Sequence, residues 1–155
     1  MSTSSSSEAV SPVDQSLATV PAHLVRRVHQ RHARLWSEVV GDEPTPPQYA
    51  VLHVVGEQPG IDLTELGARA ALDRTTVGRV VDRLLRDGLV DRRADEADRR
   101  RLVVTLTSAG RDRLAGVTPL AAEASRRLLA GLSPARADSL LDLLRAMLDD
   151  DEDDR

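Results

Sequence analysis

The sequence predicts a mainly α-helical protein with one small β-hairpin, and three observations lead to this fold class. Apolar residues recur at helical spacing near both ends of the chain, over residues 17–40 and 108–148. An amphipathic helix over residues 74–87 precedes two strand candidates, residues 89–93 and 101–106. Aromatic residues make up only 1% of the chain, so the core depends on Leu, Val and Ala, which suit packed helices.

The N-terminal helix is expected to run from Leu17 to about Val40, with its regular part beginning near Pro21. The segment GDEPTPP ends it, and a shorter helix follows from Pro47 to about Gly56. Pro or Gly marks each of these boundaries, because these residues commonly begin or end helices.

Two aspartates mark the next helix starts. Asp62 is an N-cap, and Glu65 three residues later completes a capping-box-like pattern for a helix that reaches about Ala70. Ile61, just before it, is a candidate for a short strand. Asp73 is the second N-cap, and the helix that it opens ends at Gly88.

After the hairpin, Thr107 or Ser108 caps a long helix that contains Pro119, which should kink it. Ser133 and Pro134 open the last helix. Its apolar face carries Leu140, Leu141, Leu144, Met147 and Leu148.

Helices followed by a charged hairpin in this order form a winged helix-turn-helix, expected over about residues 47–106. The terminal helices, about 17–40 and 108–148, carry apolar surface but belong to no compact lobe, so we expect them to pack together across a dimer. Residues 1–16 are Ser-rich and expected to be disordered, and residues 149–155 form an acidic tail.

The net charge of −4 conceals a segregated charge pattern. The last seven residues hold six acids and one Arg, whereas residues 74–101 hold nine Arg and six acids. All 21 basic residues are Arg, and each can bind phosphate or guanine in bidentate fashion. The expected partner is therefore double-stranded DNA.

The helix that begins at Arg74 is expected to read the DNA. Its core stripe consists of Val77, Val80, Val81, Leu84 and Leu85. The residues off that stripe are Thr75, Thr76, Arg79, Arg83 and Arg86. The threonines suit phosphate or base edges at the helix N-terminus, Arg79 suits guanine, and the last two arginines suit phosphate. The alternative is a solvated helix face with ion pairs between successive turns.

The hairpin tip carries Asp98, Arg99, Arg100 and Arg101. A tip of this kind suits a narrow minor groove, whose negative potential attracts Arg. Asp98 is expected to hold the guanidinium of Arg100 in an extended pose. The alternative is a solvated run of charges.

Four segments resemble the MarR family of bacterial regulators: PPQYAVL, LTELGARA, DRTTVGRVVDRLLRDGLV, and DRRR followed by LTSAG. The resemblance covers about residues 22–148. It implies a homodimer on a pseudo-palindromic operator, usually a repressor released by a small phenolic or aromatic anion. On matching positions, Thr75, Thr76 and Arg79 are the helix contacts, and Asp98 and Arg100 are the wing pair. Gly78 departs from the polar residue common there, so base preference at that position stays open.

The resemblance also implies a ligand pocket lined by the first, second and fifth helices, with the candidates His32, Trp36, Tyr49 and His53. Trp36 and Tyr49 could equally be core anchors. His29 and His32 have a spacing that could chelate zinc, which is the minority interpretation. We expect no cofactor and no metal.

Other classes are disfavoured. The chain has no Cys, which excludes disulfides, thiolate zinc sites and cysteine redox switches. No catalytic motif is visible, so we expect no enzyme. We see no signal peptide and no apolar run of the ~20 residues that a membrane span needs, so a cytoplasmic location is expected. The alternative function is a winged-helix protein-interaction module without DNA regulation.

Overall fold

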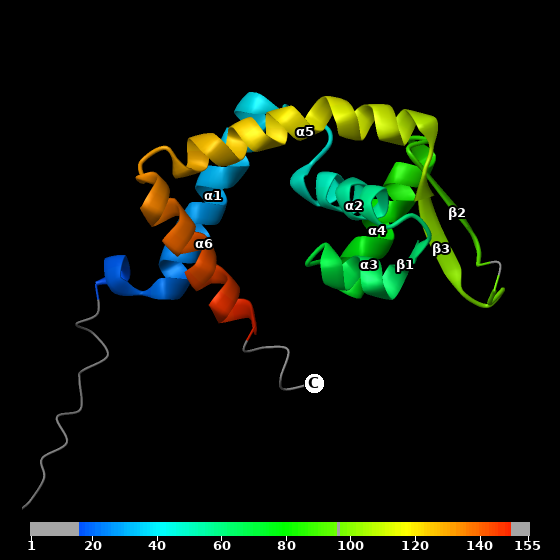
Figure 1. Cartoon of the computed structure of the whole chain (residues 1–155), viewed down its shortest axis with the longest axis horizontal. Helices are drawn as coiled ribbons and strands as arrows, with labels where there is room; N and C mark the ends of the chain where they lie inside the picture. The colour runs from blue at the N-terminus through cyan, green and yellow to red at the C-terminus, as the bar shows by residue number, and fades with distance from the viewer. Residues whose placement is uncertain (1–15, 96, 150–155) are drawn as a thin grey trace, which may run out of the picture.

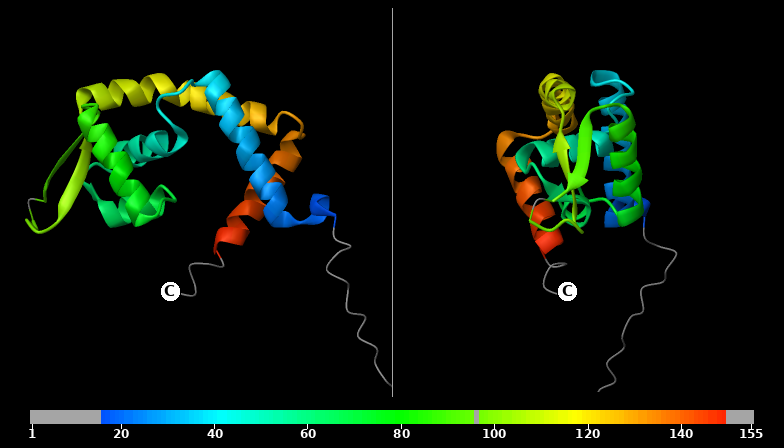
Figure 2. Two further views of the ribbon diagram at one scale, coloured as in Figure 1. Left: turned by 180° about the vertical axis from the view of Figure 1, so that it is seen from behind. Right: turned by 90° about the vertical axis from the view of Figure 1, so that its right-hand side faces the viewer.

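Two helical lobes hang from one long helix in the computed structural model, which describes residues 16–95 and 97–149 (Figure 1). The elements in chain order are a short 3₁₀ helix η1 (Leu17–Thr19), α1 (Pro21–Val39), α2 (Pro46–Glu57), β1 (Ile61–Asp62), α3 (Leu63–Arg69), α4 (Arg74–Arg86), β2 (Val90–Ala94), β3 (Leu102–Leu106), α5 (Ser108–Leu129) and α6 (Pro134–Asp149). One lobe holds α2 to β3 beneath the start of α5, and the other holds α1 and α6 (Figures 1 and 2). The predicted order of elements and the predicted fold class are confirmed.

The winged lobe has a continuous aliphatic core. Its residues with almost no exposed surface are Val51, Leu52, Val55, Ile61, Leu66, Val77, Val81, Leu84, Val90 and Val104. Burying each such side chain contributes roughly 1.5–3 kcal/mol relative to exposure. Val77, Val81 and Leu84 confirm the predicted buried stripe of α4, so the opposite face of that helix points to solvent.

Helix starts follow the predicted caps, with one correction. Asp62 accepts hydrogen bonds from the backbone N–H groups of Thr64 and Glu65, both at 2.9 Å. The predicted reciprocal bond of a capping box is wrong, because the Glu65 carboxylate accepts a bond from the side chain of Gln58 at 3.0 Å instead. The capping box lies at the start of α2, between Thr45 and Gln48.

The three strands form one antiparallel sheet in the order β1–β3–β2. Ile61 pairs with Val104, which confirms the predicted short strand, and Arg92 pairs with Val104 from the other side. β2 and β3 each begin one residue later than predicted. The sheet therefore joins the wing to the segment that leads into α3.

Helix α5 connects the two lobes without interruption. It continues through Pro119 as one helix, and Figure 1 shows the helix bowed, while a kink at Pro119 itself stays a prediction. Trp36 of α1 packs against Val117 and Ala121 of α5 in a second, smaller core. This core sits between the lobes.

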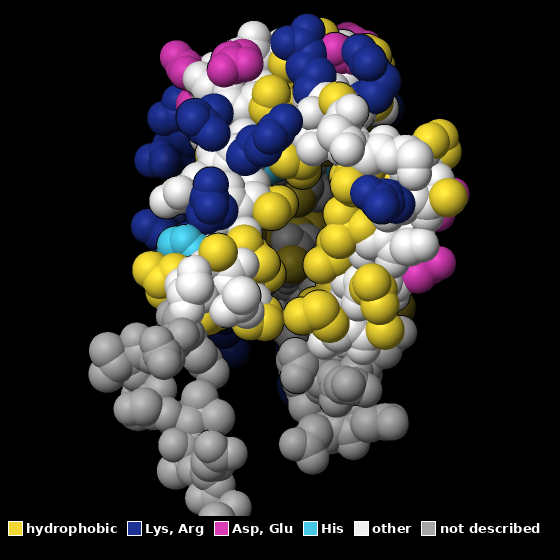
Figure 3. All heavy atoms as spheres, turned by 90° about the vertical axis from the view of Figure 1, so that its left-hand side faces the viewer, with side chains coloured by type: hydrophobic (Ala, Val, Ile, Leu, Met, Phe, Trp, Pro, Cys, Tyr) yellow, Lys and Arg dark blue, Asp and Glu magenta, His cyan; other side chains and the backbone are white. Residues whose placement is uncertain are grey.

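The lobe of α1 and α6 leaves a large apolar surface uncovered. Its exposed apolar residues are Leu17, Leu24, Val25, Val28, Leu141, Leu143, Leu144, Met147 and Leu148. Figure 3 shows apolar side chains along both walls of the cleft between α1 and α6. No described helix is both long enough and apolar enough to cross a membrane. The predicted disordered segment, apart from residue 16, and the acidic tail, apart from residue 149, lie outside the described residues.

Candidate nucleic-acid interface and ligand cavity

The solvent face of α4 presents three of the predicted DNA contacts with their side chains exposed. Thr75, Arg79 and Arg86 are exposed, and neither guanidinium makes an ion pair or hydrogen bond within the described part of the chain. Asp82, one turn before Arg86, pairs with Arg92 of β2 at 3.4 Å instead. The alternative of a helix face closed by its own ion pairs therefore does not describe Arg79 and Arg86.

Thr76 and Arg83 are engaged in contacts within the lobe. The Thr76 hydroxyl donates to Asp73 at 2.6 Å, and this bond, with the backbone N–H of Thr76, holds the pKa of Asp73 below its ordinary value. The Nε of Arg83 donates to Asp87 at 2.9 Å, and its Nη2 lies 3.6 Å from a carboxylate oxygen of Glu43. The Thr76 hydroxyl must exchange its partner before it can donate to phosphate, whereas Arg83 keeps free N–H donors while two carboxylates share its charge.

Gly78 has an open neighbourhood. A Cβ built at this position would meet no atom within 4 Å. Packing within the chain therefore does not require glycine here, and the space beside Gly78 is open to a group from a binding partner.

Carboxylates fix the backbone of the wing tip. Asp95 accepts hydrogen bonds from the N–H groups of Ala97 and Asp98 at 2.7 and 3.1 Å, which lower its pKa. Asp98 accepts a bond from the backbone N–H of Arg100 at 3.0 Å, so the prediction that it holds the guanidinium is wrong. A carboxylate two residues before an N–H closes a local turn, and this geometry outcompetes the longer side chain.

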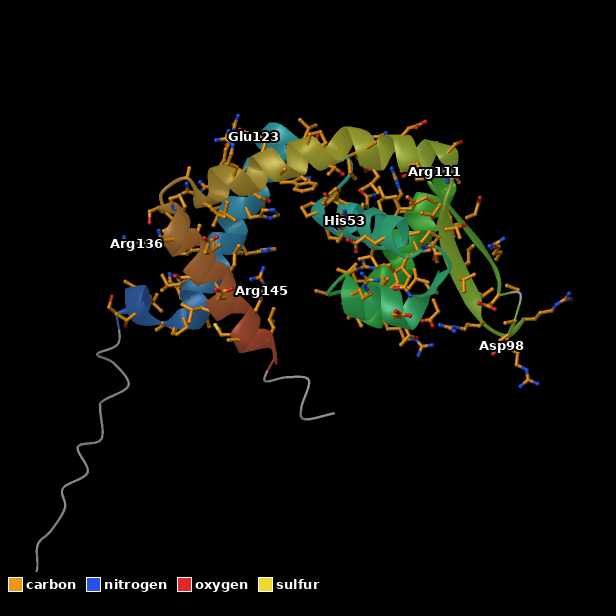
Figure 4. All side chains as sticks on the ribbon, viewed as in Figure 1. His53, Asp98, Arg111, Glu123, Arg136 and Arg145 are labelled. Atoms are coloured by element: carbon orange, nitrogen blue, oxygen red, sulfur yellow. The ribbon has the colours of Figure 1, made fainter. Side chains whose placement is uncertain are left out.

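Arg99 and Arg100 are left exposed at the tip, and their side chains have no partner among the described residues. Figure 4 places Asp98 at the outer end of the hairpin, far from the lobe of α1 and α6. Arg101, grouped with them in the sequence, turns back to Asp62.

A row of aromatic rings lies where α1, α2 and α5 meet. The ring centroids of His32 and Trp36 are 5.8 Å apart, those of Trp36 and Tyr49 are 5.3 Å apart, and those of Tyr49 and His53 are 5.7 Å apart. The indole N–H of Trp36, which is only 5% exposed, donates to the carbonyl of Pro44 at 2.9 Å. The row thus includes all four predicted pocket residues.

Three of these residues line one cavity of about 320 Å³. Its other walls are Pro46, Thr118, Ala121, Ala122 and Ser125. The resemblance implied that the fifth helix lines the pocket, but these residues of α5 were not named from the sequence, and Ala121 among them packs against Trp36. The cavity combines apolar walls with hydroxyl and imidazole groups, which suits a small aromatic molecule.

His53 belongs to a neighbouring cavity of about 460 Å³. There it lies beside Leu114, Leu106 and Arg111, and its Nε2 is 3.4 Å from Glu57. Arg111 donates to the backbone carbonyl of Leu106 at 3.1 Å. The four predicted residues are therefore divided between two cavities that share Thr118.

Burial lowers the pKa of His32, and the nearby His29 lowers it further. Burial therefore favours the neutral imidazole, which can both donate and accept a hydrogen bond. Within residues 16–95 and 97–149, no group of three or more His, Asp or Glu side chains could hold a metal ion.

Comparison with known proteins identifies the family. The sequence profile of the MarR family matches residues 44–101. The transcriptional regulator HosA of Escherichia coli O127:H6 is 32% identical over 126 residues, which are 81% of this chain and 93% of HosA. The chain belongs to the MarR family.

Solved structures of other MarR-type regulators share this architecture. PcaV of Streptomyces coelicolor, in complex with its natural ligand, matches with a TM-score of 0.83 and 39% identity, covering 87% of this chain and 96% of PcaV. A cysteine-to-serine mutant of MarR from E. coli, complexed with operator DNA, matches with a TM-score of 0.77 and 26% identity. That match covers 85% of this chain and 96% of the MarR chain.

Proposed function

We propose that this MarR-family protein is a homodimeric transcriptional repressor that binds a pseudo-palindromic operator and releases it when a small aromatic or phenolic molecule enters the cavity at Trp36. The observation that carries the proposal is how the winged lobe distributes its arginines. Arg79, Arg86, Arg99 and Arg100 stand unpaired on α4 and the wing tip among the described residues. Others pair with acids: Arg69, Arg83, Arg92 and Arg101.

Unpaired guanidiniums on a helix face and a hairpin tip fit the two grooves of a duplex. A recognition helix enters the major groove, where Arg binds guanine O6 and N7, and a wing arginine suits the adjacent minor groove. The likeness to a MarR structure with operator DNA supports this placement. Thr75 lies at the N-terminal turn of α4, the end that approaches base edges in helix-turn-helix proteins.

The uncovered apolar surface of α1 and α6 supports a dimer. Leu144 and Met147 are 41% and 61% exposed, and apolar surface of this extent is normally covered by a partner. A two-fold dimer places two recognition helices about one helical turn of DNA apart, which matches a pseudo-palindrome.

The position of the Trp36 cavity supports regulation by a ligand. Its walls come from α1, α2 and α5, so its occupant touches both the dimerisation helices and the winged lobe. A molecule that changes the angle between them changes the spacing of the two α4 helices. PcaV, similar over most of both chains, was solved with its natural ligand, which supports a ligand-responsive protein.

The first experiment is footprinting on the DNA that flanks the gene of this protein, followed by affinity measurements from 50 to 200 mM salt. We expect two protected half-sites about one turn apart and an affinity that falls steeply as salt rises. A protein-interaction module would protect no site, and that result would reject the proposal. The double variant Arg99→Gln/Arg100→Gln is the control that should lose affinity without losing the dimer.

The second experiment tests the ligand. Small aromatic and phenolic acids are titrated into the protein–operator complex, and compounds that release DNA are measured by calorimetry on the free protein. Ala122→Leu narrows the cavity from the exposed side of α5 and should abolish the response while operator binding persists. A response unchanged in this variant would place the ligand elsewhere.

A further inference from the structure

We propose that Arg101 is a positioning residue that fastens the wing to the N-terminus of α3, so that the wing and the recognition helix meet DNA as one rigid unit. The inference rests on the proposed DNA-binding function. It departs from the sequence pattern, in which Arg101 belongs to the same basic run as Arg99 and Arg100.

The two oxygens of the Asp62 carboxylate have separate tasks. Oδ1 caps α3 by accepting from the N–H groups of Thr64 and Glu65. Oδ2 accepts from two nitrogens of Arg101, Nε at 2.9 Å and Nη2. The Asp62 side chain is 20% exposed and the Arg101 side chain 49% exposed, so the contact is partly shielded on the Asp62 side only.

Both groups are held in their charged forms. The N–H of Glu65 contributes most to lowering the pKa of Asp62, and Arg101 lowers it further. The bond with Asp62 in turn raises the pKa of Arg101. The contact therefore persists across the pH range in which DNA binding is measured.

Arg101 also belongs to the turn that forms the wing tip. Its carbonyl accepts from the N–H of Asp95 at 2.8 Å, and its N–H donates to the carbonyl of Asp98 at 2.9 Å. The side chain that reaches Asp62 thus starts from the residue that closes the tip. A rotation of the tip must therefore either break this contact or move Asp62 together with the tip.

From Asp62 the connection continues to the recognition helix through close packing. A Cβ built at Gly67 of α3 would lie 3.3 Å from Cγ1 of Val77 in α4, so the two helices are in tight contact there. Leu66 and Val77 are both almost fully buried in the same core. Movement of α3 is therefore transmitted to α4, and the Asp62–Arg101 pair extends this rigid body to the wing.

Two single variants and their combination separate positioning from direct DNA contact. Asp62→Asn removes the charge but keeps a good N-cap, and Arg101→Gln keeps most of the side-chain length. Asp91→Asn is the matched control, since exposed Asp91 lies on β2 with no partner among the described residues. Arg100→Gln is the reference for loss of a cation that contacts DNA directly.

Hydrogen exchange is measured first, on the free protein. In Asp62→Asn and Arg101→Gln, the amides of Asp95 and Arg101 should exchange faster, whereas Asp91→Asn should leave them unchanged. Operator affinity should then fall by a similar factor in both variants, about 5-fold, and no further in the double variant, as expected for residues in one network. The salt dependence should stay that of the wild type.

Other results would overturn the proposal. If Arg101→Gln lowers the salt slope as Arg100→Gln does, and Asp62→Asn leaves binding equal or tighter, Arg101 is a phosphate contact. If both variants lower only the melting temperature, the pair is merely structural. If the wild type binds no operator while the amide exchange still accelerates as expected, the proposed function fails and the anchoring of the wing stands.

Discussion

Replacing Arg100 by alanine should weaken operator binding and make it less sensitive to salt. Arg100 is exposed at the wing tip, and its guanidinium has no partner among the described residues, so its removal disturbs no internal contact. The backbone N–H that bonds to Asp98 is kept in the variant. The tip should therefore retain its shape, and the change in binding should report on the guanidinium alone.

The magnitude follows from the number of wings. A dimer has two, so the variant loses two cations that neutralise phosphate charge beside the minor groove, and the slope of log affinity against log salt should fall by about 1.8. When salt is raised from 50 to 200 mM, the factor by which the wild type loses affinity should then be about 12 times the factor for the variant.

The assay is fluorescence anisotropy of a labelled operator duplex, titrated with protein at several salt concentrations in that range. Arg136→Ala is the control, because it removes the same charge from α6, at the end of the molecule opposite the wing in Figure 4. A slope that does not change in Arg100→Ala, or that changes equally in Arg136→Ala, would show that Arg100 does not contact the duplex.

Three further predictions concern the dimer, the packing and the cavity. Leu144→Asp should convert the dimer to a monomer by light scattering, because it puts a charge on the uncovered apolar face; a persistent dimer would place the interface elsewhere. In denaturant titrations, Gly110→Ala should lower the free energy of unfolding by roughly 1–3 kcal/mol or more, because the added Cβ would lie 1.9 Å from the carbonyl oxygen of Leu89. Gly116→Ala in the same helix is the control: its Cβ would meet nothing within 4 Å, so this variant should be neutral or stabilising. Because the pKa of His32 is lowered in the folded state, its contribution to stability is complete above its ordinary pKa and declines as pH falls below that value. This decline should be absent in His32→Gln melts, and an identical pH profile would contradict it.

Local signals predicted the elements well, because the physical causes lie within a few residues. Asp62 and Asp73 cap the helices expected of them, since a cap is a bond between a side chain and a backbone group two or three positions away. The strand at Ile61 is an exception, because it forms only by pairing with Val104, far along the chain. Gly88, with a φ of 69°, ends α4 as expected of a residue without Cβ.

Partner choice could not be predicted in the same way. Arg83 reaches Glu43, and Arg101 reaches Asp62, each across about 40 residues of chain. The pattern showed that these arginines lie outside the core, yet only the folded chain shows which acids face them. Glu65 likewise makes no capping box, and its carboxylate accepts from the side chain of Gln58 in the preceding helix.

The cavity was predicted in part. The aromatic and imidazole side chains of α1 and α2 were indicated by the resemblance to the MarR family, and the rings do lie in one row. The small residues of α5 that complete the wall have no distinctive chemistry in the sequence. Their role arises from the packing of Trp36 against Ala121, which depends on how two helices far apart in the sequence cross.

The buried indole of Trp36 gives this protein a built-in optical probe. It is the only tryptophan in the chain, it lines the cavity, and its N–H donates to the Pro44 carbonyl. All intrinsic emission excited at the red edge of the absorption band therefore originates at the place where an effector would bind. A compound that enters should quench or shift that emission, so chemical libraries can be screened on the unlabelled protein in a plate reader.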